Sequence, residues 1–276
     1  MTGINETAYA KINLALHVRA RRPDGYHEIE TLFAFCADGD EIAVEHAAAL
    51  TLGISGPFAA GLPVDEGNLV LRAAQAMQAH FKVGTGARIS LDKRLPVAAG
   101  LGGGSADAAA VARALNRLWR LDASDSALCA AIGPLGADVA ACIASRPALG
   151  KGMGDLLSPA PADMPLPGTP ILLVNPLKPC LTGPVYQGWD GADRGSLAIA
   201  RSGWRNDLTP GAVTLVPEIG LALYLLDELG TTQLARMSGS GATCFALFAD
   251  EAARDAARAE IAAQQPAWWT CASVLR

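Results

Sequence analysis

The sequence is poor in charge and contains no long uninterrupted apolar run. Only 18% of its 276 residues are charged, below the quarter or so that is typical of soluble proteins. The residue types AVILMFWYC make up 51%. Disordered chains combine low hydrophobicity with high charge, so this composition excludes a disordered chain. No apolar stretch reaches the roughly 18 residues that a membrane-spanning helix needs, which predicts a protein without a membrane partner.

The chain also lacks a surplus of positive charge. Its formal net charge is −5 at pH 7, whereas proteins that bind duplex DNA or RNA carry broad basic surfaces. The sequence therefore predicts no nucleic-acid partner. A small local cationic site for a phosphorylated ligand stays compatible with this charge.

Clusters of metal-ligating or redox-active residues are absent as well. The six cysteines lie far apart without a Cys-x-x-Cys pair, and the four histidines are scattered, so no zinc-like spacing occurs. Scattered cysteines in apolar stretches are typical of a reducing compartment. The first residues lack the basic, apolar and small-residue order of a secretory signal, and we expect a cytoplasmic protein.

Alternating and helical patterns follow one another along the chain in no regular order. Residues 7–19 alternate between apolar and polar side chains, which predicts a half-buried strand with Lys11 and Asn13 on its polar face. Further strands are expected at 28–35, 41–45, 87–93, 171–174, 243–248 and 270–275, and helices at 68–82, 106–119, 124–132, 217–229 and 250–263. Because no regular strand–helix–strand series appears, the α+β class is favoured.

The length and the proline distribution predict two lobes. A chain of 276 residues has room for one or two domains. Residues 158–170 contain five prolines and few aromatic anchors, which is typical of a connection between compact parts. We therefore expect an N-terminal lobe at residues 1–157 and a C-terminal lobe at residues 158–276.

A glycine-rich stretch between a strand and a helix is the strongest local signal. Gly102, Gly103 and Gly104 are followed by Ser105, a residue type that often caps a helix N-terminus. Exposed backbone N–H groups and the helix dipole favour an anion there, and a triphosphate fits. The stretch matches neither the Walker loop nor G-x-G-x-x-G nor G-x-S-x-G. A plain strand–helix turn is the alternative.

Two charged residues stand in apolar surroundings. Lys11, in the middle of its strand, could neutralise charge on a transferring phosphoryl group; alternatively, its ammonium group extends into solvent from the strand face. Asp138, in a run of small apolar residues, could accept a proton from a substrate hydroxyl; alternatively, it caps the helix that follows.

Three further places carry side chains suited to a ligand. Tyr26 and His27 follow a tight turn and could stack on a base or sugar, with Tyr186 as a second aromatic wall. The small-residue loop 238–241 could set N–H groups and hydroxyls against a phosphate. Each place also has an ordinary alternative. Tyr26 could cover the sheet edge beside a solvated His27, and Tyr186 could be a partly buried loop residue. Residues 238–241 could be a tight turn that leads into a core strand.

The order of these stretches resembles the GHMP kinase superfamily. The matching stretches are Ala-Tyr-Ala-Lys-Ile-Asn-Leu at 8–14, Arg-Pro-Asp-Gly-Tyr-His at 22–27, Lys-Arg-Leu-Pro to Ser-Ala-Asp at 93–107, Leu-Gly-Ala-Asp at 135–138 and Ser-Gly-Ser-Gly-Ala at 238–242. The glycine-rich stretch marks the superfamily. The pair Lys-Ile-Asn-Leu and Asp-Gly-Tyr-His resembles those members that act on a sugar alcohol carried on cytidine diphosphate, in the non-mevalonate route to isoprenoids.

The resemblance implies a fold, a reaction and a set of site residues. The N-terminal lobe is expected to be like the second domain of ribosomal protein S5 and the C-terminal lobe to be ferredoxin-like, with ATP and Mg²⁺ as cofactors. Asp138 is expected to be the base and Lys11 its partner, and the protein ligands of the metal stay unknown. The residues expected near ATP are Asn68, Lys93, Pro96, Val97, Ala98, Ala99, Gly100, Leu101, Gly102, Gly103, Gly104, Ser105 and Ala106. Those expected near the cytidine diphosphate-linked substrate are Asn13, Tyr26, His27, Thr182 and Tyr186.

The sequence departs from the superfamily pattern at a few positions, and two other functions stay open as alternatives. Ala98 and Ala99 replace glycines often found in the loop, and residues 180–192 match poorly around Tyr186. A kinase for another small alcohol, such as homoserine or mevalonate, is one alternative, although Asp-Gly-Tyr-His would then have no base to contact. A non-catalytic nucleotide-binding module is the other, and its signature would be the loss of Lys11 or Asp138, both of which are present.

Overall fold

The computed structural model describes residues 3–162, 164–165, 167–198 and 200–276, and these form two compact units. The first unit comprises residues up to Ala10, Asp38–Val97 and Gly102–Ser145. The second comprises Lys11–Ala37, Ala98–Leu101 and residues from Arg146 onward. Each unit is built from segments far apart in the sequence.

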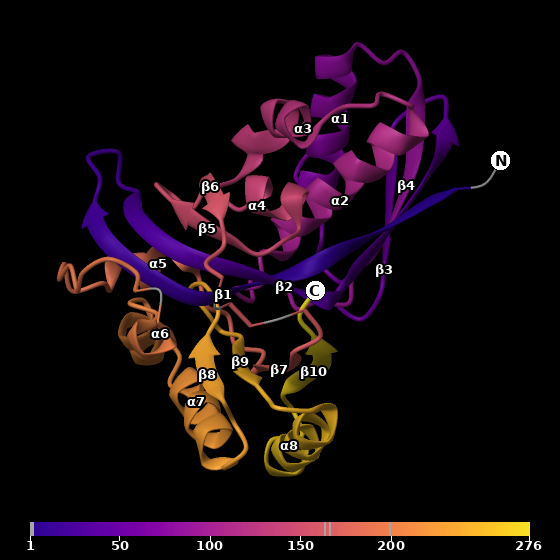
Figure 1. Ribbon diagram of the computed structural model, residues 1–276. Helices are drawn as coiled ribbons and strands as arrows, with labels where there is room; N and C mark the ends of the chain where they lie inside the picture. The colour runs from indigo at the N-terminus through magenta and orange to yellow at the C-terminus, as the bar shows by residue number, and fades with distance from the viewer. Residues whose placement is uncertain (1–2, 163, 166, 199) are drawn as a thin grey trace. The chain divides into compact units, whose positions relative to one another are not determined.

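The first unit combines a helical cluster with sheet strands (Figure 1). Its helices are α1 (Leu69–Phe81), α2 (Gly103–Leu118), α3 (Asp125–Ile132) and α4 (Val139–Ala144), with the short 3-10 turn η1 (Gly133–Leu135). Strand β4 (Gly86–Asp92) pairs in parallel with β3 (Thr51–Ser55) and antiparallel with the second part of β2 (His27–Ala47). Helix α2 packs against both α1 and α4.

Small side chains explain the close packing of α2. Six buried alanines lie along it, at positions 106, 108, 109, 110, 112 and 114. Since the distance between packed helices depends on side-chain size at the contact, alanines let α1 and α4 approach on two sides. The packing of α2 within the first unit thereby determines where its first residues, Gly103 and Gly104, lie.

The second unit contains a four-stranded antiparallel sheet in the order β10-β7-β9-β8. Its strands are β7 (Pro170–Asn175), β8 (Leu234–Met237), β9 (Cys244–Leu247) and β10 (Trp269–Val274). Helices α7 (Glu218–Glu228) and α8 (Glu251–Gln264) pack on this sheet (Figure 1). The succession of strands and helices together with this strand order is the ferredoxin-like arrangement that was expected.

The rest of the second unit consists of strands and short helices. It holds the greater part of β1 (Ile4–Arg21), the first part of β2, β5 (Ala148–Lys151) and β6 (Leu156–Pro159). Helices α5 (Thr182–Gln187) and α6 (Thr209–Leu215) and the 3-10 turn η2 (Arg201–Gly203) follow β7. Among the described residues, no helix combines the length and the apolar character needed to cross a membrane.

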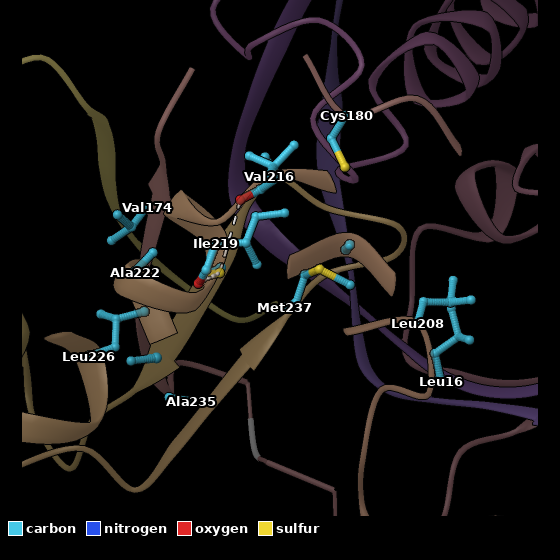
Figure 2. Close-up of a cluster of buried hydrophobic side chains, with 14 of the residues drawn as sticks. Leu16, Val174, Cys180, Leu208, Val216, Ile219, Ala222, Leu226, Ala235 and Met237 are labelled. Carbon is cyan, nitrogen blue, oxygen red and sulfur yellow. Dashed lines mark hydrogen bonds between the residues drawn. The ribbon is translucent and has the colours of Figure 1, made fainter. Parts of the chain in front are cut away.

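A hydrophobic core in the second unit joins β1 to the four-stranded sheet and its helices (Figure 2). Leu16 from β1 packs in one buried cluster with Val174 from β7, Met237 from β8 and Ile219 and Leu226 from α7. Each such side chain contributes about 1.5–3 kcal/mol when it is removed from water. The core therefore fixes β1, the strand that carries Lys11, against the sheet and its helices.

Several details differ from the pattern-based predictions. The strands predicted at residues 28–35 and 41–45 form one strand, β2, which runs through the polar residues between them without a break. Helix α2 begins at Gly103 rather than at Ser105, so Ser105 is not its N-cap. Strands β3, β5, β6 and β8 were not predicted. The division of the chain at residues 157 and 158 stays a prediction, since the compact units are made of interleaved segments.

Candidate active site

Lys11 is buried on the polar face of β1. Its side chain is part of a residue that is only 3% exposed, and its ammonium group donates a hydrogen bond to Asn13 Oδ1 at 2.9 Å. The same nitrogen lies 5.4 Å from the centre of the Phe33 ring, within the range of a cation–π contact. The alternative in which Lys11 extends into solvent is therefore wrong.

Asn13 is oriented by three neighbours. Its amide nitrogen Nδ2 donates to Thr31 Oγ1 at 2.7 Å, and that hydroxyl donates to Ala15 O at 2.7 Å. Its backbone N–H donates to Ser238 Oγ at 3.3 Å. With Nδ2 occupied by Thr31, the carboxamide oxygen faces the Lys11 ammonium. The arrangement fixes a cation in a desolvated place, where its electrostatic effect on a reacting group is large.

The first part of the glycine-rich loop, residues 98–101, is fastened by hydrogen bonds to its backbone carbonyl oxygens. The N–H of Lys11 donates to Leu101 O at 3.0 Å, and Ser238 Oγ donates to Gly100 O at 2.8 Å. A side chain at Gly100 would place its Cβ 2.3 Å from Ser238 O, so only glycine fits. Ala98 adopts a φ of 52°, the left-handed region that favours glycine, at one of the two positions where the superfamily often has glycine.

The second part of the loop becomes the start of α2. Gly102 occupies the N-cap position with φ 63° and makes no side-chain capping bond. The first N–H groups of a helix have no partner within the helix, and the dipole adds partial positive charge there. Residues Gly103, Gly104 and Ser105 thus present donors suited to a phosphate group.

A buried ion cluster lies beneath this first turn. The Lys93 ammonium is 2.5 Å from Asp40 Oδ2 and 2.6 Å from Asp107 Oδ2. It also lies 3.1 Å from the position that a Cβ on Gly103 would take. The structure thus pairs the Lys93 ammonium with two carboxyl groups, and the expected contact between Lys93 and ATP stays a prediction.

Asp138 lies directly before α4, at its N-cap position. Its side chain makes no capping hydrogen bond, so the alternative role as a helix cap is wrong. The residue belongs to the first unit and Lys11 to the second, and the expected partnership between them stays a prediction. Asn68, unlike Asp138, does cap a helix: at the start of α1 its Oδ1 accepts from Val70 N at 2.9 Å. Its expected place near ATP stays a prediction.

Aromatic side chains gather around His27. Its ring centre lies 5.0 Å from that of Tyr186 on α5 and 5.7 Å from that of Trp189, edge to face. Burial and the charge of Arg21 lower the pKa of His27, so it is neutral at pH 7. The Tyr26 residue is 61% exposed, which leaves its ring accessible to a ligand. The structure thus brings together His27 and Tyr186, as expected, and adds Trp189.

Thr182, at the start of α5, lies beside the small-residue loop at residues 238–241. Its hydroxyl and that of Ser240 are 2.9 Å apart, and the Cys180 thiol donates to Ser240 O at 3.2 Å. The loop itself is held by Asn206, whose Nδ2 donates to Met237 O and Gly239 O, each at 2.8 Å. The residues of this loop are therefore fixed rather than free to rearrange.

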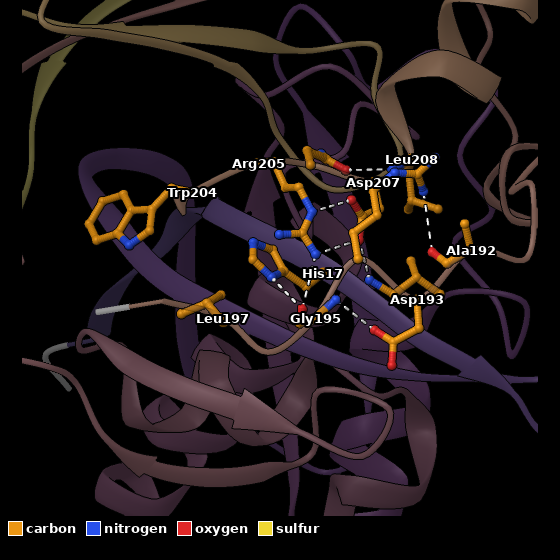
Figure 3. A network of polar contacts seen from close by, with 12 residues as sticks. His17, Ala192, Asp193, Gly195, Leu197, Trp204, Arg205, Asp207 and Leu208 are labelled. Carbon is orange, nitrogen blue, oxygen red and sulfur yellow. Dashed lines mark hydrogen bonds and ion pairs between the residues drawn. The ribbon is translucent and has the colours of Figure 1, made fainter. Parts of the chain in front are cut away.

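Farther along β1, a polar network fastens the segment around residue 195 (Figure 3). His17 is fully buried, and its Nδ1 lies 3.3 Å from Gly195 O, to which Arg205 also donates at 3.0 Å. Arg19 forms ion pairs with Asp193 and Glu30. Burial, together with the charge of Arg205, lowers the pKa of His17, so this histidine is neutral in the folded protein.

Sequence reasoning missed Thr31, Asp40 and Trp189 altogether. It gave Asp107 no role of its own, and it placed Ser238 in a loop that could face a phosphate without predicting its contact with Gly100. A carboxylate inside an alanine-rich helix was the available signal for Asp107. The other partners come from segments distant in sequence, and their proximity depends on strand pairing.

The described residues contain no cluster of three or more His, Cys, Asp or Glu side chains that could hold a metal. They do contain a buried cation, Lys11, and a helix N-terminus whose first N–H groups have no partner within the helix, the parts that phosphoryl transfer needs. Two family models match, GHMP kinases N terminal domain at residues 68–146 and GHMP kinases C terminal at residues 194–267. The chain belongs to the GHMP kinase family.

Curated relatives within this family match almost end to end. A 4-diphosphocytidyl-2-C-methyl-D-erythritol kinase of Sphingopyxis alaskensis is 51% identical over 99% of each chain. The protein of the same name from Novosphingobium aromaticivorans is 52% identical over 99% of this chain and 93% of its own.

Solved structures agree with this placement. A crystal structure of 4-(cytidine 5'-diphospho)-2C-methyl-D-erythritol kinase is similar with a TM-score of 0.81 and 33% identity, over 98% of both chains. A homoserine kinase from Cytophaga hutchinsonii has a TM-score of 0.74 at 19% identity, over 99% of this chain and 95% of its own. At that identity the likeness concerns the fold alone.

Proposed function

We propose that this protein transfers the γ-phosphoryl group of ATP to the 2-hydroxyl of 4-diphosphocytidyl-2-C-methyl-D-erythritol. The observation that carries the proposal is the 51% identity, over 99% of both chains, with a relative of that name. The buried Lys11 and the donors at the start of α2 support the same chemistry. This reaction would be a step in the non-mevalonate route to isoprenoid precursors.

Each candidate residue takes one role in this proposal. Asp138 accepts the proton of the 2-hydroxyl as that oxygen attacks the γ-phosphorus, and ADP leaves. Lys11, held by Asn13, stabilises negative charge on the transferring group. The segment 96–106 binds the triphosphate through backbone N–H groups. Catalysis of this kind rests mainly on positioning and electrostatics.

We infer that Mg²⁺ enters with the nucleotide. Magnesium is commonly held by one or two protein groups together with substrate phosphates, and the described residues offer no acidic cage for it. When bound, the ion would neutralise charge on the phosphate oxygens. The chain's own residues would supply the remaining positive field, through Lys11 and the α2 N-terminus.

We propose that Tyr26, His27 and Tyr186 contact the cytidine group. The exposed Tyr26 ring offers a stacking face, and His27 with Tyr186 forms a fixed wall. Asn13 and Thr182 would bind the polar groups of the substrate. The homoserine and mevalonate kinases share the fold at 19% identity or less, and at that identity the likeness says nothing about their substrates.

The test is ADP release by the purified protein with ATP and Mg²⁺, offered the cytidyl substrate, homoserine or mevalonate in parallel. We expect turnover with the cytidyl substrate only. Turnover with another alcohol would keep the phosphate loop and reject the stacking assignment. ATP binding without turnover on any of them would favour a non-catalytic nucleotide-binding protein.

The base role of Asp138 has its own test. Asp138→Asn removes the proton acceptor with little change in shape, and we expect kcat to fall by about 100-fold or more, as general base catalysis contributes about that much. The folded state should persist, because asparagine has nearly the same size and shape as the aspartate it replaces. Circular dichroism checks the fold, and a near-normal kcat would remove Asp138 from the base role.

A further inference from the structure

One buried ammonium faces two carboxyl groups in the first unit. Lys93, Asp40 and Asp107 have side chains only 4%, 0% and 5% exposed, and Lys93 Nζ contacts Oδ2 of both acids. If both acids are ionised, the cluster carries a net charge of −1 away from water. Such a charge is costly to bury unless every oxygen has a partner.

The two carboxyl groups differ in how they are satisfied. Asp40 Oδ1 accepts from the backbone N–H groups of Arg94 and Leu95, at 2.6 and 2.8 Å. Asp107 Oδ1 is buried and has no hydrogen-bond partner among the described residues. Backbone donors therefore satisfy Asp40 Oδ1, whereas Asp107 Oδ1 has none, so Asp107 is the acid that gains from a proton. Burial raises the pKa of Asp107 to about 7; the charge of Lys93 opposes this rise and that of Asp40 adds to it.

The position of Asp107 connects this cluster to the phosphate loop. Asp107 lies in the second turn of α2, and side chains on a helix lean toward its N-terminus. Lys93 Nζ lies 3.1 Å from the Cβ position of Gly103, the first residue of that helix. The cluster therefore lies directly beneath the backbone N–H groups that we assign to the phosphates. Negative charge arriving there disfavours a second negative charge on Asp107.

We propose that Asp107 is a positioning residue that takes up a proton when nucleotide phosphates bind at residues 102–106. The proposal rests on the proposed function, which assigns the phosphates to this segment. The proton comes from solvent and adds to the carboxylate of Asp107, and no covalent bond of the nucleotide changes. Lys93 stays charged and paired with Asp40, so the cluster changes from a net charge of −1 to neutral.

Calorimetry tests the proposal directly. A non-hydrolysable ATP analogue with Mg²⁺ is titrated into the protein at about pH 8 in two buffers of different ionisation enthalpy, which counts the protons taken up. Wild-type protein should take up nearly one proton per nucleotide. The Asp107→Asn variant should take up almost no proton. The control is Asp125→Asn, which replaces an exposed acid at the start of α3 and should take up as many protons as wild type.

The outcomes distinguish a failure of the role of Asp107 from a failure of the proposed function. Nucleotide binding with no proton uptake, or with equal uptake in Asp107→Asn, overturns the role of Asp107 and leaves the proposed function standing. No nucleotide binding by the wild type overturns both. If Asp107→Asn does not fold, two wild-type measurements decide. One is the proton uptake in the two buffers. The other is the nucleotide affinity, which should weaken by up to about tenfold per pH unit above pH 7.

Discussion

At the scale of single residues, the sharpest expectation concerns Tyr26. Its ring is exposed on the loop between β1 and β2, so it contributes little to stability and is available for stacking. Tyr26→Ala should raise KM for the cytidyl substrate by about 5- to 150-fold, because one base–aromatic contact contributes about 1–3 kcal/mol. KM for ATP should stay unchanged. Tyr26→Phe keeps the ring and should behave almost like wild type; equal rises for both substrates would reject the stacking role.

At the scale of elements, α4 depends on its neighbours to hold Asp138. A helix of six residues is not stable alone. Arg113 on α2 holds its C-terminal end by donating to Cys142 O at 2.6 Å and to Ser145 Oγ at 3.1 Å, and it also donates to Thr7 O at 3.0 Å. One side chain therefore connects α4 and β1 within the first unit.

Arg113→Lys should accordingly lower kcat more than it changes KM. A single ammonium cannot make all these contacts, and a small shift of a catalytic group can cost up to about 100-fold in rate. We expect a fall of about 10- to 100-fold in kcat with KM for ATP preserved. Arg117→Lys is the matched control, because Arg117 lies on the same helix and both arginines form an ion pair with Glu6. If both variants lose kcat equally, the effect does not pass through α4.

At the scale of the whole molecule, His17 makes the stability of the folded state depend on pH. Its pKa is lowered in the folded protein by burial and by the charge of Arg205, so the unfolded chain binds more protons below about pH 6.5. Its contribution to stability is complete above that pH and is lost as the pH falls toward the folded-state pKa. His27 acts in the same direction. Asp107 acts in the opposite direction, because its pKa is raised, and its contribution is lost as the pH rises toward 7.

Urea unfolding of His17→Gln at about pH 7.5 and 5.5 separates these effects. The variant should lose less stability than wild type between the two pH values, since glutamine takes up no proton. His46→Gln replaces an exposed histidine and should keep the wild-type difference. Because Asp107 is present in all three proteins, its share cancels. A wild-type-sized loss in His17→Gln would show that His17 does not carry the pH dependence.

The sequence predicted the elements with strong periodicity and missed those without it. Helix α1 was expected at residues 68–82 and runs over Leu69–Phe81, because its buried face repeats at helical spacing. Strand β8 is only four residues long and carries no alternation long enough to recognise. Serine commonly caps helices, which predicts Ser105 as the cap of α2, but Gly102 in a left-handed conformation is the N-cap and the helix begins earlier.

By itself, the sequence determined the family, the glycine-rich loop and the polar face of β1, since these depend on the order of residues within short segments. Only the tertiary structure decided that Lys11 is buried against Asn13, that Lys93 pairs with Asp40 and Asp107, and that Trp189 joins His27. These contacts join residues through side-chain packing or across segments distant in the chain. Whether a charged group is desolvated, and what partner it has, depends on which segments the fold brings around it.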